Sequence, residues 1–433
     1  MSIDKQLYDN YINILKIELI PALGCTEPIA IAYASAKSRE VLGEMPEKIV
    51  MNCSGNIIKN VKSVTVPNSN GMKGIDAAAI LGVVGGKADK KLEVLSDITD
   101  EDRKKALELI DKKISNTILV ENVPNLYIDA TLEAKGHSVS VVIEKYHTNI
   151  TKIIKDGQVI FDHNNNVNTD TEEVHIDKKS ITIRSILDFA NEVKIEDVKD
   201  LLDRQIEYNT NISNEGLKND WGAKIGKTII KTFGDNINSR LMAKAAAGSD
   251  ARMSGCPMPV VTNSGSGNQG MTVSLPVIEY AKEINATDDK LYRALIVSNL
   301  ISVHLKYYIG QLSAFCGAVT AGCGAMSGIA YLKTNGDYKI ICDTITNILM
   351  NVGGIVCDGA KASCAAKIFA SLNAGILGLN MAMDGIVFNP GDGLVLNDIE
   401  STIKNIGYLG RVGMKQTDVE ILKAMIGQAN IEL

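Results

Sequence analysis

The chain has 433 residues and a net charge of −6, with 45% hydrophobic and 22% charged residues. These proportions are typical of a globular protein and exclude a mainly disordered chain, a collagen and a coiled-coil rod. Nucleic-acid-binding proteins carry clustered Lys and Arg residues, and this chain has no basic run, so its composition argues against that class. At about 100–200 residues per domain, we expect two or three domains.

The first residues of the chain and its cysteine content predict where the protein works. The segment Met1-Ser-Ile-Asp-Lys5 lacks the basic flank and apolar core of a signal peptide, so we expect a cytoplasmic protein. Thiols stay reduced in the cytoplasm. The eight cysteines therefore indicate metal binding or catalysis rather than a disulfide framework.

Residues 5–44 are expected to form two helices with a break at Pro21-Ala-Leu-Gly24, and to pack on the helical part of the chain. From residue 45 the pattern changes to short alternating segments, which predict an α+β domain. The expected strands are 49–51, 61–66, 92–95, 118–120, 126–132, 138–144 and 149–154, and the expected helices are 74–84 and 99–113. The asparagine-rich segment 162–171 is expected to be a surface linker that closes this domain.

Strand signals nearly vanish beyond residue 179, where alanine- and glycine-rich helical segments follow one another. The predicted fold class is therefore α+β. It has a large all-helical domain (171–433), expected to be catalytic, an inserted smaller α+β domain (45–170), and N-terminal helices (1–44) that pack on the helical domain.

One uncharged stretch of 26 residues, 307–332, exceeds the length of about 20 residues that spans a bilayer. It is rich in alanine and glycine, which favour close packing between helices inside a protein. We therefore expect a buried helix here, with no membrane span.

The cysteines include two pairs with the same spacing, Cys316/Cys323 and Cys357/Cys364. The first pair lies in the uncharged, helix-like stretch, where seven residues rise about 10.5 Å and separate the two thiols. The second pair follows a glycine pair and encloses an Asp-Gly step, and turns of this kind can direct two sulfurs to one centre. Cys357 and Cys364 are thus the better ligand pair, although a buried cysteine can also be a simple core residue.

Cys25 stands directly before Thr26-Glu-Pro28, which has the residue types of a helix start. The positive end of a helix dipole lowers the pKa of a thiol at this position, while Glu27 opposes the effect. On the residues alone, a catalytic thiol and a buried structural thiol are equal alternatives.

Residues 263–270, Asn263-Ser-Gly-Ser-Gly-Asn-Gln-Gly270, contain the glycine spacing of a dinucleotide-binding loop. A Rossmann fold also needs a βαβ unit, and no suitable second strand follows, so an NAD-dependent oxidoreductase is only a minor alternative. A glycine-rich loop before a helix offers free amides to a carboxylate, although it can also be a tight connection between packed helices. The predicted substrate-binding residues are Ser264, Gly265, Ser266, Gly267, Asn268 and Gln269.

Four ordered segments resemble the L-cysteine desulfidase family, which is related to the α-chain of iron–sulfur L-serine dehydratases. They are Leu23-Gly-Cys-Thr-Glu-Pro-Ile29, Ala247-Gly-Ser-Asp-Ala-Arg-Met-Ser-Gly255, Ser264-Gly-Ser-Gly-Asn-Gln-Gly270 and Val356-Cys-Asp-Gly-Ala-Lys-Ala-Ser-Cys364. The resemblance spans essentially the whole chain. It implies a lyase with one 4Fe-4S cluster per chain and no pyridoxal phosphate, which converts L-cysteine to pyruvate, ammonia and sulfide.

The resemblance also implies residue roles. It places the three cluster ligands at Cys316, Cys357 and Cys364, places the proton acceptor at Cys25, and leaves Cys323 without a role. A cluster with three protein ligands leaves one iron open, and that iron can act as a Lewis acid toward the leaving sulfur. The loop at 264–269 would then hold the substrate carboxylate.

Two alternatives to the desulfidase stay open besides the oxidoreductase. L-serine dehydration would use the same machinery to expel hydroxide, and a non-enzymatic protein that binds small ligands would use its cysteines only in the core. The expected partner is the small molecule L-cysteine, with neither nucleic acid nor membrane, and a homo-oligomer is an open alternative to a monomer.

Overall fold

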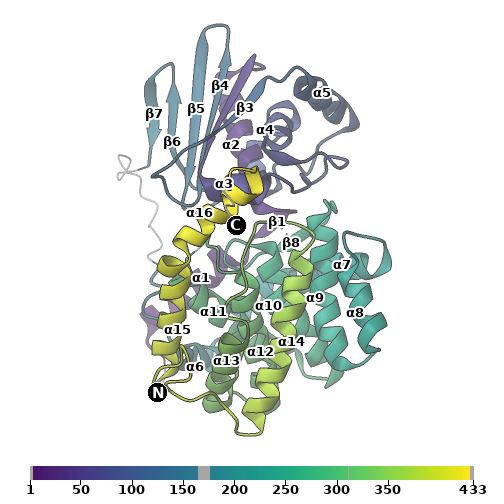
Figure 1. Cartoon of the computed structure of the whole chain (residues 1–433), viewed down its shortest axis with the longest axis vertical. Coiled ribbons are helices and arrows are strands. Elements are labelled where there is room, and N and C mark those ends of the chain that lie inside the picture. The colour runs from purple at the N-terminus through teal and green to yellow at the C-terminus, as the bar shows by residue number, and fades with distance from the viewer. Residues whose placement is uncertain (1–2, 164–175, 311, 430–433) are drawn as a thin grey trace.

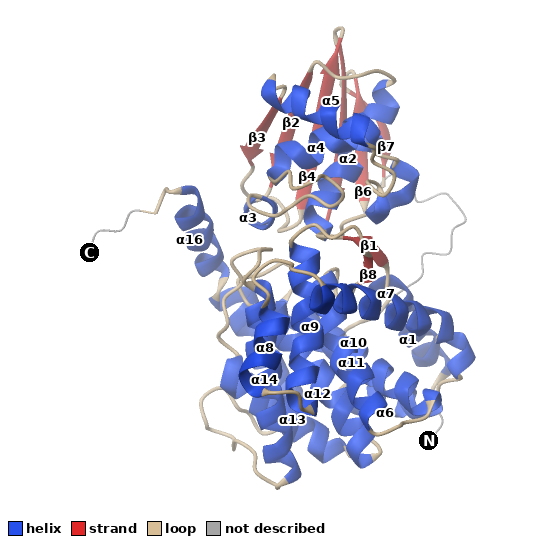
Figure 2. Cartoon of the chain, turned by 90° about the vertical axis from the view of Figure 1, so that its right-hand side faces the viewer, coloured by secondary structure: helices blue, strands red, loops and turns tan. Residues whose placement is uncertain are grey.

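The structure is a computed structural model that describes residues 3–163, 176–310 and 312–429. Its elements form two packed bodies, a sheet covered by helices and a larger helical body, which lie end to end in Figures 1 and 2. Residues 164–171 of the expected linker lie outside the described residues. The α+β fold class is confirmed.

The six-stranded sheet has the order β3-β2-β4-β5-β6-β7, in which only β2 and β3 run parallel. Its strands are β2 (Lys48–Cys53), β3 (Ser115–Leu119), β4 (Tyr127–Ala134), β5 (His137–Glu144), β6 (Ile150–Lys155) and β7 (Gln158–Asp162). Strand β4 alternates buried and half-buried residues, as expected for a sheet with one face on the core. Lys135 and Gly136 join β4 to β5 with φ angles of 49° and 83°, the left-handed values that a tight two-residue hairpin turn needs.

Helices cover one face of this sheet (Figure 2). They are α2 (Thr26–Leu42), α3 (Gly55–Val61), α4 (Gly74–Gly85), α5 (Asp100–Asp111) and the short 3-10 helix η1 (Ala88–Glu93). Helices α2 and α4 pack closely because Gly82 has no side chain; a Cβ there would lie 2.3 Å from the carbonyl oxygen of Ala32. The Ser38 hydroxyl donates a 2.7 Å hydrogen bond to the carbonyl of Ala130 on β4, which fixes α2 against the sheet.

This placement of α2 corrects the expectation that all of residues 1–44 packs on the helical domain. Only α1 (Lys5–Glu18) does so, through Tyr11, Ile14 and Leu15. Helix α2 is buried without interruption from Ile29 to Ala36 and shares a core with the strands. A helix that is apolar on all sides has no single face from which its partner can be predicted.

Three other expected elements are also corrected. Residues 61–66 are the end of α3 and an irregular segment, and residues 92–95 lie in η1 and the turn after it. Both are short apolar runs, for which helix and strand patterns are ambiguous. The uncharged stretch 307–332 is two helices, because α11 ends at Ile309 and α12 begins only at Gly317.

The helical body is built around α10, α11 and α12, whose residues are buried on nearly every side. Its elements are α1, α6 (Ile183–Glu192), η2 (Ile195–Asp197), α7 (Lys199–Lys218), α8 (Ile225–Phe233), α9 (Ile237–Met253), α10 (Gly267–Glu283), α11 (Asp288–Ile309), α12 (Gly317–Thr334), α13 (Tyr338–Val352), α14 (Cys364–Met383) and α15 (Ile399–Tyr408). A π-helical turn, η3 (Leu409–Gly413), and α16 (Lys415–Ile426) follow, and α16 reaches back to α3 beside the sheet (Figure 1).

Among the described residues, α14 alone is long and apolar enough to cross a membrane by length and composition. It packs against α9, α12 and α13 in the helical body. One such helix is weak evidence for a span, because core helices meet the same criteria.

The two bodies meet at a pair of three-residue strands. Strand β1 (Pro21–Leu23) pairs antiparallel with β8 (Pro259–Val261), so that Pro21 faces Val261 and Leu23 faces Pro259. The pairing places the start of α2 beside the loop that opens α10. Two segments that are far apart in the sequence are thereby brought to one junction (Figure 1).

Aromatic packing holds α1 on the helical body. Phe189 of α6 is fully buried, with its ring stacked on that of Tyr11 at 4.7 Å and edge-to-face with that of Tyr8 at 5.4 Å. We predict that Phe189→Ala lowers the free energy of unfolding by about 3–5 kcal/mol, because it leaves a cavity in a packed core. Phe233→Ala is the control, since Phe233 also stacks on a phenyl ring but is 52% exposed, and it should cost about 1 kcal/mol or less. Urea unfolding followed by circular dichroism measures both, and equal losses of stability would contradict the assignment.

Candidate active site

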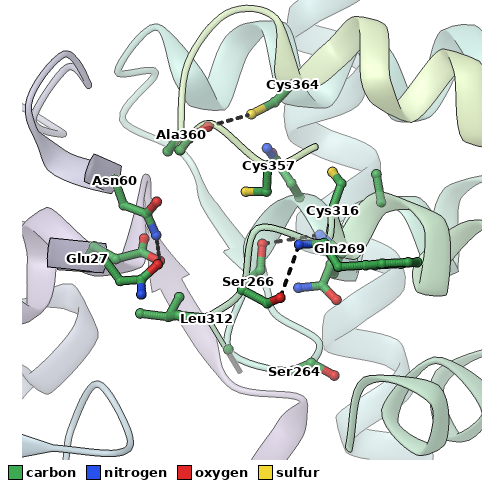
Figure 3. Close-up of a pocket in the computed structure, with 18 of the residues that line it drawn as sticks. Glu27, Asn60, Ser264, Ser266, Gln269, Leu312, Cys316, Cys357, Ala360 and Cys364 are labelled. Atoms are coloured by element: carbon green, nitrogen blue, oxygen red, sulfur yellow. Dashed lines mark hydrogen bonds between the residues drawn. The ribbon is translucent and has the colours of Figure 1, made fainter. Parts of the chain in front are cut away.

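A cavity lies at the junction of the two bodies and draws its lining from both of them (Figure 3). Its volume of about 110 Å³ is several times the ~10–15 Å³ that one water molecule needs. The sheet body contributes the start of α2, α3 and the turn between β5 and β6. The helical body contributes the end of α9, the loop before α10, the end of α11 and the two segments that carry the cysteines.

Cys316, Cys357 and Cys364 all line this cavity, and Figure 3 shows their thiols along one side of it. A short backbone pairing brings the first two together: the amide of Cys316 donates to the carbonyl of Ile355 at 3.0 Å, and the amide of Cys357 donates to the carbonyl of Ala314 at 2.6 Å. Cys364 opens α14, after the turn that the sequence predicts. The expected ligand set is therefore assembled in one place.

Cys323 differs from these three residues. It lies well inside α12, is fully buried in the helical core and does not line the cavity. The helix rise separates it from Cys316, as the spacing argument predicts.

The loop that carries Cys357 is seated on α3 of the sheet body. Gly359 has a left-handed φ of 96°, and a Cβ on it would lie 2.5 Å from the carbonyl oxygen of Lys59. The Lys59 ammonium donates to the carbonyl of Cys357 at 3.3 Å and also forms an ion pair with Asp418 of α16. The wall of the cavity that carries Cys316, Cys357 and Cys364, the thiol wall, therefore depends on contacts between the two bodies.

Positive charge surrounds the thiols. The pKa of Cys357 is lowered, first by its hydrogen bond with the Cys316 thiol and then by the charges of Lys59 and Lys306, while burial opposes the shift. The pKa of Cys316 is raised by the same hydrogen bond and by burial. Burial also raises the pKa of Cys364. The cations favour thiolates, which is the form that binds metal.

The three thiols are the donor type of an iron–sulfur cluster. Within the described residues, no three His, Cys, Asp or Glu side chains converge closely enough to bind one metal ion. A cluster of several irons is wider than one ion, so its ligands stand further apart, and cysteine thiolates are its usual ligands. Cys316, Cys357 and Cys364 are the residues that would hold it.

The glycine-rich loop turns sharply between β8 and α10. Ser264 and Gly265 adopt left-handed φ angles of 50° and 74°, and Ser266 caps α10 by accepting a 3.4 Å hydrogen bond from the amide of Gln269. The amides of Gly267 and Asn268, in the first turn, have no intrahelical acceptor. All of the predicted loop residues except Gly267 line the cavity. Within the described part of the chain, strand β8 pairs only with β1, and antiparallel, so the loop does not sit in the βαβ unit of a dinucleotide site.

Cys25 lies immediately behind the cavity wall rather than in it. Its thiol is 1% exposed and lies 3.8 Å from the sulfur of Met253. Burial raises the pKa of Cys25 to about 12, with Arg252 opposing and Glu27 adding to the shift. The expectation of a lowered pKa is therefore wrong, because desolvation of the thiolate outweighs the helix dipole.

The segment around Cys25 is nevertheless fixed to the glycine-rich loop. The Thr26 hydroxyl donates to the carbonyl of Gly265 at 3.0 Å, and the Arg252 side chain donates to the carbonyl of Gly24 at 2.9 Å. Two motifs that the sequence shows separately thus form one wall.

A group of polar side chains that includes Glu27 and Asn60 lies opposite the thiols (Figure 3). The sequence did not predict this group. The carboxylate of Glu27 accepts a 3.2 Å hydrogen bond from Asn60 and lies 3.7 Å from Nε2 of His147, an ion-pair rather than a hydrogen-bond distance. Burial alone would raise the pKa of Glu27, but His147 and Arg252 outweigh it and lower this pKa to about 2. Glu27 belongs to the segment 23–29 that carries the family resemblance, whereas His147 sits in a hairpin turn with no ligand spacing.

Several polar atoms on the cavity wall are buried and have no hydrogen-bond partner among the described residues. They are Oδ1 of Asn56, Asn60 and Asn268, and Nε2 of His147. Buried polar atoms are nearly always satisfied in native proteins, so these atoms indicate a polar ligand or water in the cavity.

Comparison with known proteins identifies the family. Residues 89–423 match the family model described as the serine dehydratase alpha chain. The chain belongs to this family. Membership implies a lyase of the serine dehydratase kind that depends on an iron–sulfur centre.

The serine dehydratase family match is accompanied by full-length relatives. UPF0597 protein DSY1109 of Desulfitobacterium hafniense (strain Y51) is 51% identical over 98% of both chains. A UPF0597 protein of Lachnoclostridium phytofermentans is 50% identical over 97% of this chain and 100% of its own. A UPF0597 protein of Treponema denticola is 46% identical over 98% of this chain and 100% of its own. These names specify no reaction.

Substitution of Gly359 tests whether the contact between the Cys357 loop and α3 positions Cys357. We predict that Gly359→Ala lowers the iron bound per chain at least several-fold after anaerobic purification, because its Cβ would strain a left-handed residue and meet the Lys59 carbonyl. Gly354→Ala in the same loop is the matched control, since no atom lies within 4 Å of its Cβ position and its φ is not left-handed. Iron analysis and visible absorption measure both variants. Equal iron in the two would show that the contact with Lys59 does not position Cys357.

Proposed function

We propose that this chain catalyses the β-elimination of L-cysteine to pyruvate, ammonia and sulfide with a 4Fe-4S cluster held by Cys316, Cys357 and Cys364. The observation that carries the proposal is the convergence of these three thiols on one cavity that also contains the glycine-rich loop. Three protein ligands leave one iron open, which when bound supplies a Lewis acid for the leaving sulfur.

Within this proposal, the loop at 264–269 binds the substrate carboxylate. Asn268 lines the cavity, and its amide lies in the first turn of α10, where the helix dipole favours a negative charge. Ser264, Ser266 and Gln269 add uncharged polar groups around the same cavity. The opposite wall, with ionised Glu27 and the unpaired amide oxygen of Asn60, suits the α-amino group of an amino acid.

Cys25 is proposed to accept the α-proton. Its helix is joined to the carboxylate loop through Thr26, so the thiol is held at a fixed place near the bound substrate. Its raised pKa makes the thiolate strongly basic when it forms, and scarce at neutral pH. Elimination would then yield aminoacrylate, which hydrolyses to pyruvate and ammonia in water.

A second candidate is the dehydration of L-serine, which the family match favours. The same residues would hold the same cluster and the same carboxylate. Only the leaving group would differ.

Turnover tests the proposal directly. Protein purified and reconstituted without oxygen should release sulfide and pyruvate in equal amounts from L-cysteine, at a higher kcat/KM than pyruvate from L-serine. Cys357→Ala should lose both activities, and Cys323→Ala should keep them because that thiol does not line the cavity. Pyruvate from L-serine alone would favour the dehydratase, and no product from either amino acid in iron-replete protein would contradict the lyase proposal.

Cys25→Ser separates a proton acceptor from a cluster ligand. In the same buried position an alcohol ionises far less readily than a thiol, so turnover should fall about 10²–10⁴-fold, the usual loss of general-base catalysis. Exchange of the substrate α-hydrogen in deuterium oxide should fall with it, while the iron content stays at the wild-type level. Wild-type turnover in this variant would assign the proton to a group on the wall, such as Glu27 or His147, and loss of iron would place Cys25 on the cluster.

A further inference from the structure

A second, larger cavity of about 900 Å³ adjoins the thiol cavity. The two cavities share four lining residues, His147, Ser264, Gly265 and Lys306. These four residues form a neck between the outer cavity and the thiols. A substrate that came through the outer cavity would pass the neck to reach the proposed open iron.

Among the described residues that line the outer cavity, positive side chains outnumber negative ones, although the whole chain has a net charge of −6. The cationic residues are Lys16, Lys178, Lys179, Lys306 and Arg411, and the acidic ones are Glu18 and Asp177. Lys178 pairs with Glu18, but an excess of one sign of charge in a cavity still raises the local concentration of ligands with the opposite charge. The outer cavity therefore favours anions.

Lys306 is the cation at the neck, and it is unusual for a buried lysine because its ammonium lacks a hydrogen-bond or ion-pair partner among the described residues. It is 6% exposed, close to the C-terminus of α11. Its ammonium makes no hydrogen bond or ion pair within the described part of the chain. Lys59 in the thiol cavity is equally buried, but Asp418 and the carbonyl of Cys357 satisfy it.

A buried ammonium without a partner is costly, so a ligand that pairs with it gains affinity. The neck also presents Ser264 and Gly265, which lead into the free amides at the start of α10. A carboxylate has two oxygens and can accept hydrogen bonds from an ammonium and from amides at once. Lys306 at the neck and the amide of Asn268, which lines the adjoining thiol cavity, are thus the two kinds of donor that a carboxylate needs.

We infer that Lys306 binds the α-carboxylate of the substrate at the neck and so makes the enzyme selective for amino acids over amines. This inference rests on the proposed function for the identity of the substrate. The charge of Lys306 and the loop donors would hold the carboxylate, which leaves the β-carbon directed toward the thiol wall.

Lys306 could instead serve as a counter-charge for the thiolates, since Cys316 and Cys357 lie within its electrostatic reach. The two roles differ in a measurable way. A counter-charge acts on the retention of iron, whereas a carboxylate anchor acts on the affinity for ligands that carry a carboxylate.

The test uses ligands that cannot react. L-alanine has the α-amino and α-carboxylate groups but no leaving group on its β-carbon, and ethylamine lacks the carboxylate. Calorimetric titration of the anaerobic, iron-replete protein with each ligand gives the carboxylate selectivity without any turnover. Lys306→Gln should weaken L-alanine binding about 10- to 100-fold, the usual worth of a charged hydrogen bond, and leave ethylamine unchanged.

Two further variants serve as controls. Lys306→Arg keeps the charge and should restore most of the selectivity for L-alanine. Lys339→Gln makes the same change of charge on an exposed lysine of α13 and should behave as wild type.

The outcomes separate the two roles. If Lys306→Gln loses iron but keeps its preference for L-alanine, Lys306 serves the thiolates and the inference is wrong. Wild-type protein that binds ethylamine as tightly as L-alanine would also overturn it, whatever the variants do. Loss of selectivity in Lys306→Gln, in a protein that does not cleave L-cysteine, would support the carboxylate site and refute only the proposed reaction.

Discussion

The short backbone pairing of residues 314–316 with 355–357 is the contact on which the site depends. Two hydrogen bonds and the Phe315–Val356 bridge bring Cys316 and Cys357 to the same wall, although 41 positions separate them in the sequence. The uncharged stretch must break for this to happen, and it does so at Gly310, whose φ of 98° ends α11. A single continuous helix over residues 307–332 would leave no loop here to pair with residues 355–357.

Buried charge is the second constraint. Three thiols that must ionise to bind iron lie in an interior where burial raises their pKa values, so nearby cations have to compensate. The hydrogen bond with Cys316 lowers the pKa of Cys357 most, and the charges of Lys59 and Lys306 add to this shift. Because Lys59 comes from the sheet body, the site is complete only when both bodies are in contact.

The sequence predicted those parts of the site that are local. The glycine-rich loop, the Asp-Gly turn before Cys364 and the helix start at Thr26 each follow from a few adjacent residues. The order of these motifs along the chain also indicated the family, and the family match over residues 89–423 supports that inference. The parts that could not be predicted are tertiary contacts between segments far apart in the sequence. Strands of three residues such as β1 and β8 are too short to show an alternating pattern, so the sequence did not predict the junction that they form. Helix α2 is apolar on every side, so the sequence did not predict which of the two bodies it packs on.

The same reason explains which cavity residues were missed. His147 lies in a hairpin turn and Lys306 near the end of a buried helix, and no neighbouring residue marks either of them. Only the fold brings them to the neck. The pKa of Cys25 was mispredicted because dipole and burial act in opposite directions, and the depth of burial is not a property of the local sequence.

Diffraction data collected at the iron absorption edge from anaerobically grown crystals test the central claim most directly. The account predicts one compact iron signal per chain, with Cys316, Cys357 and Cys364 as its only protein ligands and one iron facing the loop at 264–269. Iron bound through Cys25 or Cys323, or no iron at the three thiols in protein that cleaves L-cysteine, would contradict it.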